Sequence, residues 1–248
     1  MERDRTPETR KTTETSFAII DAIENLGGAT LSELADYTGL ATSTVHTHVQ
    51  TLLEAEYVVE LDGKYNLGLK LFHLGEKARN RDERYRIARQ TAVELAEKVS
   101  DEVNFSVEEY GRSIVLFDET SSPNQEGFQV GRYFHMHSSA SGKAMLAEYD
   151  EERVRSIIDR WGQPQHTEHT ITDIDALLEE LAVVSRRGYS VNQQEELEGL
   201  RAVGMAVNEP DGSVFGALDI SGPSYRLPDE EEVADRLRPF VDDLEQKL

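Results

Sequence analysis

Apolar residues recur at helical spacing in three segments of the first third of the chain. The first segment, residues 15–26, stops at Gly27 and Gly28, and residues 1–14 before it are predicted to be a flexible polar tail. Its inward positions are expected to be Phe17, Ile19, Ile20, Ile23 and Leu26. The second segment follows a cap at Thr30 or Ser32, and its predicted inner face is formed by Leu31, Leu34 and Ala35.

The third segment, residues 42–53, is expected to begin at Thr42 or Ser43 as the N-cap. Its apolar stripe consists of Val45, Val49, Leu52 and Leu53. Two short helices joined by a turn that contains Gly39 predict a helix-turn-helix. Two β-rich runs on either side of Asp62-Gly63 predict a hairpin after it. A helix, a helix-turn-helix and a hairpin in this order predict a winged helix over residues 15–76.

The outward face of the third segment carries hydroxyl, amide and imidazole groups. No carboxylate lies between Ala41 and Leu53, although the chain contains 48 acidic residues. Hydroxyl, amide and imidazole groups can contact base edges or phosphate oxygens. The N-terminus of the helix favours a phosphate. His48 lies beside the apolar stripe and is expected to be partly buried and hydrogen-bonded. The residues expected to contact DNA are Thr42, Ser43, Thr44, His46, Thr47 and Gln50, with Lys64 in the hairpin. The alternative is a winged helix that makes only protein contacts.

A basic stretch follows the predicted winged helix. Neither Gly nor Pro interrupts residues 77–110, so the pattern predicts one linker helix, assigned to residues 77–100. Residues 1–76 hold 6 basic and 13 acidic residues, residues 77–110 hold 7 and 8, and the remainder holds 13 and 27. The linker is therefore either a solvated connection between domains or a helix whose first turns lie near phosphates, through Arg79 and Arg81.

Residues 101–248 alternate between strand-like and helical patterns. Two strands are expected around Tyr110-Gly111, and a strand-like run over residues 128–138 leads into a helix that starts near Ser141. Helices are expected at 150–159 and 172–187, then a hairpin around Asp211-Gly212 and a closing helix. Strands at both ends with helices between them predict an α+β domain built on an antiparallel sheet.

Composition narrows the class of protein. With 38% hydrophobic and 30% charged residues, no membrane-spanning run and no signal peptide, the chain is expected to be soluble and cytoplasmic. The absence of cysteine excludes disulfides and thiolate metal sites. A net charge of −22 with only 7 lysines among 26 basic residues favours a protein that works in molar salt, over a merely acidic mesophilic protein. Strong screening also weakens the release of counterions that drives most DNA binding.

Several kinds of catalytic or metal site were considered and set aside. The stretch 138–144 has Gly142-Lys143 but neither the first glycine nor the Ser or Thr of a phosphate-binding loop. There is no Gly-x-Ser-x-Gly nucleophile elbow. A zinc site is physically possible at His135, His137, His166 and His169, but no cysteine and no carboxylate partner is identifiable. The sequence therefore predicts no catalytic residue, no metal and no cofactor.

Three stretches of the second half carry a family resemblance: "HMHSSASGKAMLA", "RRGYSVNQQEELEGLRAVGMAV" and "GALDISGPSYRL". With the winged helix and the linker, they resemble the IclR family of transcriptional regulators from about Thr15 to the C-terminus. The resemblance implies a winged-helix DNA-binding domain, a GAF-like effector-binding domain and a homodimer or tetramer that controls genes of small-molecule metabolism. The alternative is a metabolite-binding or enzymatic α+β protein whose winged helix contacts protein.

The resemblance also implies site residues. The family usually has Arg or Lys near the start of the recognition helix, where this chain has Thr42 and Thr47, so part of that role is assigned to Arg10, Lys11, Arg79 and Arg81. The effector pocket of acid-binding members uses an Asp, a Cys and two Ser, and those positions fall on Asn192, Ala202, Asp219 and Ser221. The nearby loop is Ser139, Ala140, Ser141 and Gly142. A pocket that gains Asp219 should disfavour another carboxylate, so a neutral polyol, a sugar or an amine-bearing effector is expected.

Overall fold

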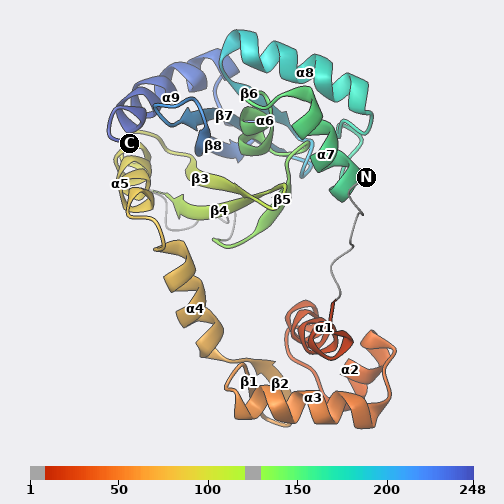
Figure 1. Cartoon of the computed structure of the whole chain (residues 1–248). Coiled ribbons are helices and arrows are strands. Elements are labelled where there is room, and N and C mark those ends of the chain that lie inside the picture. The colour runs from red at the N-terminus through yellow and green to blue at the C-terminus, as the bar shows by residue number, and fades with distance from the viewer. Residues whose placement is uncertain (1–8, 121–129) are drawn as a thin grey trace, which may run out of the picture. The chain divides into compact units, whose positions relative to one another are not determined.

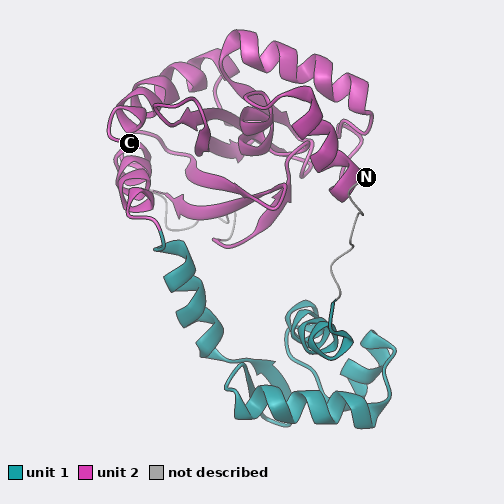
Figure 2. Ribbon diagram, in the orientation of Figure 1, with its two compact units in different colours: residues 1–81 teal, residues 82–248 magenta. Residues whose placement is uncertain are grey.

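The computed structural model describes residues 9–120 and 130–248 (Figure 1). The chain divides into two compact units between Arg81 and Asp82 (Figure 2). Residues 1–8 of the predicted tail, and residues 128–129 of the strand-like run, lie outside the described residues. No helix in the described ranges is long and apolar enough to cross a membrane.

The first unit contains the predicted winged helix. Its elements are α1 (Lys11–Leu26), α2 (Leu31–Thr38), α3 (Thr42–Glu54), β1 (Val58–Leu61) and β2 (Lys64–Leu67). The two strands pair antiparallel around Asp62 and Gly63, which both have positive φ, as a tight hairpin requires. The core between the helices and the hairpin contains Ile19, Ala22, Ile23, Leu34, Val45, Val49 and Tyr65.

Three details of this unit differ from the sequence prediction. Helix α1 begins at Lys11, so residues 11–14 are helical rather than part of a flexible tail. Phe17 is 61% exposed and Leu26 is 40% exposed, because the buried face of α1 is set by Ile19, Ala22 and Ile23. The N-cap of α3 is Ala41, whose side chain can accept no hydrogen bond, and neither Thr42 nor Ser43 has that role. The cap of α2 is Thr30, one of the two predicted residues.

The prediction of one continuous linker helix is wrong, because the structure has two helices separated by a break at residues 80–83. Helix α4 (Leu69–Arg79) ends where the Asn80 amide donates to the Glu76 carbonyl at 2.6 Å. Helix α5 (Arg84–Ala96) begins where the Asp82 carboxylate accepts the Arg84 N–H at 2.9 Å. These side chains compete with the backbone for the bonds of a continuous helix. The helix is therefore interrupted although residues 80–83 contain neither glycine nor proline.

The second unit is built on one six-stranded antiparallel sheet with the order β5-β4-β3-β8-β7-β6. This confirms the predicted α+β class. The strands are β3 (Glu102–Glu109), β4 (Arg112–Glu119), β5 (Tyr133–His135), β6 (Ser190–Gln193), β7 (Leu200–Asn208) and β8 (Val214–Pro223). The helices after α5 are α6 (Ala140–Leu146), α7 (Glu151–Trp161), α8 (Ile174–Arg187) and α9 (Glu230–Glu245).

The two faces of this sheet have different chemistry because side chains alternate along each strand. Helices α5 and α9 cover a face of large apolar residues, among them Val103, Phe105, Val203, Leu218 and Ile220. Helix α6 packs against β7, β8 and β6 on the other face, where α7 and α8 also contribute to the core. That face is polar or small at Asn104, Ser106, Ser190, Asn192, Ala202, Gly204, Asp219 and Ser221. A buried polar surface therefore lies beneath α6.

Candidate DNA-binding and effector sites

The outward face of α3 is exposed as predicted. Its stripe Val45, Val49 and Leu52 is buried in the core. The residues of this helix predicted to contact DNA are all exposed, and so is Thr51: they are Thr42, Ser43, Thr44, His46, Thr47 and Gln50. The Thr47 hydroxyl donates to the Ser43 carbonyl at 3.0 Å, which leaves the lone pairs of its oxygen available to a ligand.

His48 lies apart from this face. Its Nδ1 is 2.8 Å from the Ser16 hydroxyl of α1, and the residue is half-buried. The contact ties α3 to α1, which confirms the prediction of a partly buried, hydrogen-bonded histidine.

The cations assigned to DNA lie on other elements of the first unit. Lys64 is exposed at the hairpin turn. Arg79 is in the last turn of α4, which leads away from the hairpin (Figure 1), and its guanidinium is 2.6 Å from Glu76. Arg81 is exposed in the break after α4. The charge of Arg79 is therefore compensated by Glu76, whereas the exposed face of α3 has no Lys, Arg, Asp or Glu before Glu54.

In the second unit, six of the eight predicted effector residues line one cavity beneath α6. They are Ser139, Ala140, Ser141, Asn192, Ala202 and Asp219. Ser221 is not among the lining residues, but it is bonded to one of them, because the Asn104 amide donates to the Ser221 hydroxyl at 3.2 Å. Gly142 lies outside the lining, and a side chain there would collide with the backbone of Met136. The cavity measures about 10 Å³, room for about one water molecule.

The carboxyl group of Asp219 is at the centre of this polar surface. The pKa of this group is raised to about 7, mainly by burial and also by Asp118 and Glu102, against the lowering effect of the Asn104 amide, which is bonded to it at 3.2 Å. The group therefore holds a proton in weakly acidic solution and can then donate a hydrogen bond.

Helix α6 is held closely over the sheet. The Ser190 hydroxyl donates to the Ala140 carbonyl at 2.5 Å, and a Cβ on Gly204 would lie 3.0 Å from the backbone of Ala140. Buried Lys143 donates to Glu195 at 2.5 Å, and the Glu195 N–H donates to the Asn192 side chain at 2.8 Å. This chain of contacts joins α6 to the segment after β6 and to the cavity.

Two polar residues of the cavity were not predicted from the sequence. Asn104 and Ser106 of β3 line it, and Asn104 Oδ1 and Ser106 Oγ are buried with no hydrogen-bond partner. Buried polar atoms normally have partners, so these two are available to a ligand. Their signal in the sequence is the alternation of polar and large apolar residues in Asn104-Phe105-Ser106-Val107.

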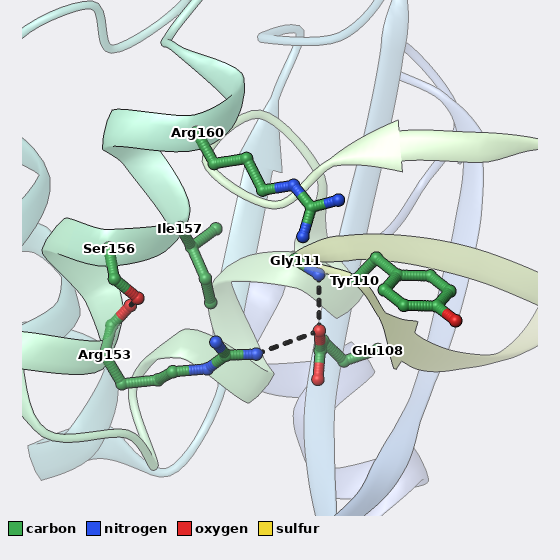
Figure 3. A pocket seen from close by; sticks show the side chains of 7 residues that line it. All are labelled: Glu108, Tyr110, Gly111, Arg153, Ser156, Ile157 and Arg160. Atoms are coloured by element: carbon green, nitrogen blue, oxygen red, sulfur yellow. Dashed lines mark hydrogen bonds and ion pairs between the residues drawn. The ribbon is translucent and has the colours of Figure 1, made fainter. Parts of the chain in front are cut away.

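A second cavity, of about 260 Å³, lies between the turn after β3 and helix α7 (Figure 3). Glu108 lines this cavity, and its carboxylate accepts from the Gly111 N–H and from Arg153. Gly111 has a φ of +85°, and a side chain there would lie 3.0 Å from the indole nitrogen of Trp161. These contacts fasten the turn to α7, and Arg153 is paired with Glu108.

Comparison with known proteins gave matches over most of the chain. The family described as "IclR helix-turn-helix domain" matches residues 13–62, and "Bacterial transcriptional regulator IclR C-terminal" matches residues 80–247. A probable HTH-type transcriptional regulator ArcR of Halobacterium salinarum is 33% identical over 86% of this chain and 83% of its own length. The transcriptional repressor IclR of Escherichia coli is 28% identical over 84% of this chain and 77% of its own length.

Solved structures share the fold. The IclR of Thermotoga maritima has a TM-score of 0.75 at 24% identity and covers 96% of this chain and 98% of its own. An IclR-type regulator from Alicyclobacillus acidocaldarius has a TM-score of 0.81 at 21% identity, over 96% of this chain and 99% of its own.

Proposed function

Because the chain belongs to the IclR family of transcriptional regulators, we propose that it contacts its operator through the exposed face of α3 and responds to a small molecule bound beside Asp219. Membership makes it a DNA-binding regulator with a C-terminal effector-binding domain, and not an enzyme. The residues that make these contacts, the class of effector and the oligomeric state are the substance of the proposal.

One observation carries the proposal for DNA. In a chain with 48 acidic residues, α3 exposes seven hydroxyl, amide or imidazole side chains and no carboxylate until Glu54. A carboxylate there would repel phosphates, whereas these groups can accept from and donate to base edges. Lys64 and Arg81, and Arg79 where a phosphate replaces Glu76 as its partner, add charge that attracts any DNA sequence.

A gel-shift experiment on the DNA around the chain's own gene distinguishes base contacts made by α3 from phosphate contacts made by the arginines. Thr44→Ala and Gln50→Ala should relax the preference between operator variants, by about 1–3 kcal/mol for each lost base contact. Arg79→Glu combined with Arg81→Glu should instead weaken binding to all sequences and lower its dependence on salt.

The possible outcomes separate this proposal from its rival. If the arginine changes altered sequence preference and the α3 changes did not, the two roles would be reversed. If no DNA shifted between dilute buffer and molar KCl, the winged helix would be a protein-contact module instead.

The effector we propose is a small hydroxylated or amine-bearing molecule. Asn104, Ser106, Asn192 and Asp219 offer hydrogen bonds, and ionised Asp219 opposes a second carboxylate in the cavity. The cavity holds about one water molecule, so a larger ligand requires α6 and the sheet to separate. The ligand would thus favour an opened state and shift its population.

A thermal-shift screen of the full chain at pH 8 tests this class. Polyols, sugars and amines are expected to include the compounds that raise the unfolding temperature, and short organic acids are expected to have no effect. Asp219→Asn should reduce the response to an amine and preserve the response to a neutral polyol. Stabilisation by an organic acid alone would contradict the proposal.

We further propose that the chain is a homo-oligomer whose first unit forms a dimer contact. Helix α4 has no buried residue, and Leu69 and Phe72 are 85% and 68% exposed. An isolated helix of this length is marginal in water, so a partner surface would stabilise it. Two copies would present two α3 helices to a near-palindromic operator.

The setting we propose is the cytoplasm of an organism that keeps molar salt. The net charge of −22, the scarcity of lysine and the similarity to a Halobacterium salinarum protein support it. Folding followed by circular dichroism from dilute buffer to molar KCl tests it. An unfolding temperature that did not rise with KCl would contradict it.

A further inference from the structure

Three histidines and one glutamate of the second unit gather outside the effector cavity. His135 ends β5, His137 precedes α6, and His166 lies in the segment between α7 and α8. Their ring centroids are 5.3 Å apart for His135 and His166, 5.7 Å for His135 and His137, and 6.1 Å for His137 and His166. Segments that are distant in sequence thus bring three imidazoles together.

The bonding of His137 leaves one of its nitrogens without a partner. The residue is fully buried, and its Nε2 is 3.2 Å from the carbonyl oxygen of Pro164. A carbonyl oxygen only accepts, so Nε2 must carry the hydrogen. In the neutral ring, Nδ1 then has a free lone pair, and this buried atom has no hydrogen-bond partner. A metal-bound histidine has this arrangement, with one nitrogen donating to a carbonyl and the other on the ion.

The spacing of the rings is close to that of a metal site. Zinc–nitrogen bonds are about 2.0–2.1 Å, which sets ring centroids roughly 5 Å apart around a tetrahedral ion. The observed separations of 5.3–6.1 Å exceed this by about 1 Å or less. In the described part of the chain, no three or more His, Asp or Glu side chains are placed so that they could hold a metal ion as they stand. Binding therefore requires side-chain rotations that bring the nitrogens to a common point.

Glu196 supplies the carboxylate that was not identifiable from the sequence. Its Oε2 is 3.7 Å from His166 Nε2 and accepts a hydrogen bond from the Ser138 hydroxyl at 2.6 Å. Such a bond orients a carboxylate as outer partners do in metal sites. The side chains of His166 and Glu196 are 27% and 10% exposed, so an ion can reach them from solvent.

We propose that His135, His137 and His166, with Glu196 as the fourth ligand, form a site for one divalent first-row transition-metal ion. Imidazole and carboxylate ligands suit Zn²⁺, Co²⁺ and Ni²⁺. The ion would join β5, the approach to α6 and the segments before α8 and after β6.

The experiment uses the full chain without an affinity tag, freed of metal with a chelator and kept in molar KCl. Zn²⁺ is titrated in competition with a chromophoric chelator, and Co²⁺ is added separately to record the visible spectrum of tetrahedral Co²⁺. The wild-type chain should bind one Zn²⁺ and give that spectrum. Ser138→Ala should lower affinity about tenfold, because Glu196 loses its orienting bond.

The double variant His135→Gln/His166→Gln should lose more affinity than the tenfold to hundredfold that loss of an outer partner costs. His169→Gln is the matched control, since this histidine is in the same segment as His166 and its side chain is 43% exposed. It should bind Zn²⁺ as the wild type does. Zn²⁺ should also raise the unfolding temperature of the wild type and of the control.

The proposal is overturned if the wild-type chain yields all Zn²⁺ to the competitor, or if the double variant binds as tightly as the wild type. Equal losses in the control and the double variant would place the ion elsewhere. Should the double variant fail to fold, the Co²⁺ spectrum of the wild type and the affinity of the single variant His135→Gln decide. An experimental structure with only water at His137 Nδ1 after soaking in Zn²⁺ would also refute the site.

Discussion

At the scale of single residues, Asp219 is a buried carboxyl whose surroundings oppose its charge. It is 4% exposed, and burial is the main reason that its pKa is raised to about 7. In the unfolded chain an aspartate titrates near 3.9. Between these values the folded state holds a proton that the unfolded state has lost. The contribution of Asp219 to the free energy of unfolding is therefore fully present below about pH 4 and is lost as the pH rises to about 7.

We expect Asp219→Asn to remove this dependence. Relative to the wild type, the variant should gain about 2–3 kcal/mol between pH 5 and pH 8, since about two pH units of proton release no longer oppose folding. Denaturant unfolding followed by the fluorescence of Trp161, the one tryptophan of the chain, measures this. Asp159→Asn, at an exposed position of α7, should show no such gain. An equal pH dependence in wild type and Asp219→Asn would mean that other carboxyls are responsible.

The residues of the cavity show what sequence and resemblance can locate. Resemblance pointed to Asn192, Ala202 and Asp219, and the structure brings them to one cavity. Asn104 was missed because its strand was predicted without knowledge of which face would lie under α6. Pairing settles that question, since Asn104 stands opposite Asp219 in the sheet. Contacts of this kind depend on strand order, which local pattern does not determine.

At the scale of elements, the start of α2 is fixed by reciprocal hydrogen bonds. The Thr30 hydroxyl accepts the Glu33 N–H at 3.3 Å, and the Glu33 carboxylate accepts the Thr30 N–H at 2.7 Å. Such a capping box satisfies two N–H groups that the helix leaves unpaired. The sequence narrowed this cap to Thr30 or Ser32 because its signal is entirely local. The break between α4 and α5 also has a local signal, in Asn80 and Asp82, but the absence of glycine and proline concealed it.

Thr30→Ala should therefore destabilise α2 by about 1 kcal/mol. Hydrogen exchange measures the effect, and the amides of α2 should exchange about fivefold faster where their opening is local. Thr12→Ala, at an exposed position in the first turn of α1, is the control and should leave exchange in α2 unchanged. If α2 exchanged at the wild-type rate in Thr30→Ala, the capping box would contribute nothing to its stability.

A buried ion pair joins two elements of the second unit. Lys143 of α6 is 1% exposed and bonds Glu195, whose pKa is raised by burial even though Lys143 lowers it. Lys143→Met leaves a buried carboxylate without its cation and should cost about 3 kcal/mol. The double variant Lys143→Met/Glu195→Gln should recover part of that loss. Trp161 fluorescence in denaturant measures both, and a double variant no more stable than the single would show that the pair's charge is not the cause.

At the scale of the whole molecule, the first unit exposes more apolar surface than its own core can cover. Val59, Leu61, Leu67 and Leu69 line a groove of about 1110 Å³ beside the hairpin. Phe72, one turn further along α4, is 68% exposed. Soluble monomers rarely expose a contiguous apolar patch of this kind. The sequence placed these residues in a hairpin and a helix, but periodicity alone cannot distinguish a face that meets the same chain from one that meets another copy.

If this groove and the neighbouring Phe72 form the dimer contact, charge placed on Leu69 and Phe72 should separate the copies. Leu69→Glu combined with Phe72→Glu should convert the dimer to a monomer in sedimentation experiments, because two carboxylates would be buried without partners. Operator affinity should fall about 100-fold or more, since one copy engages one half-site and the gain from simultaneous binding is lost. Tyr225→Glu places one carboxylate on a residue of the second unit that is 88% exposed, and should leave both properties unchanged. A groove variant that stayed dimeric but lost operator binding would place the dimer contact elsewhere and give these residues a role in DNA binding itself.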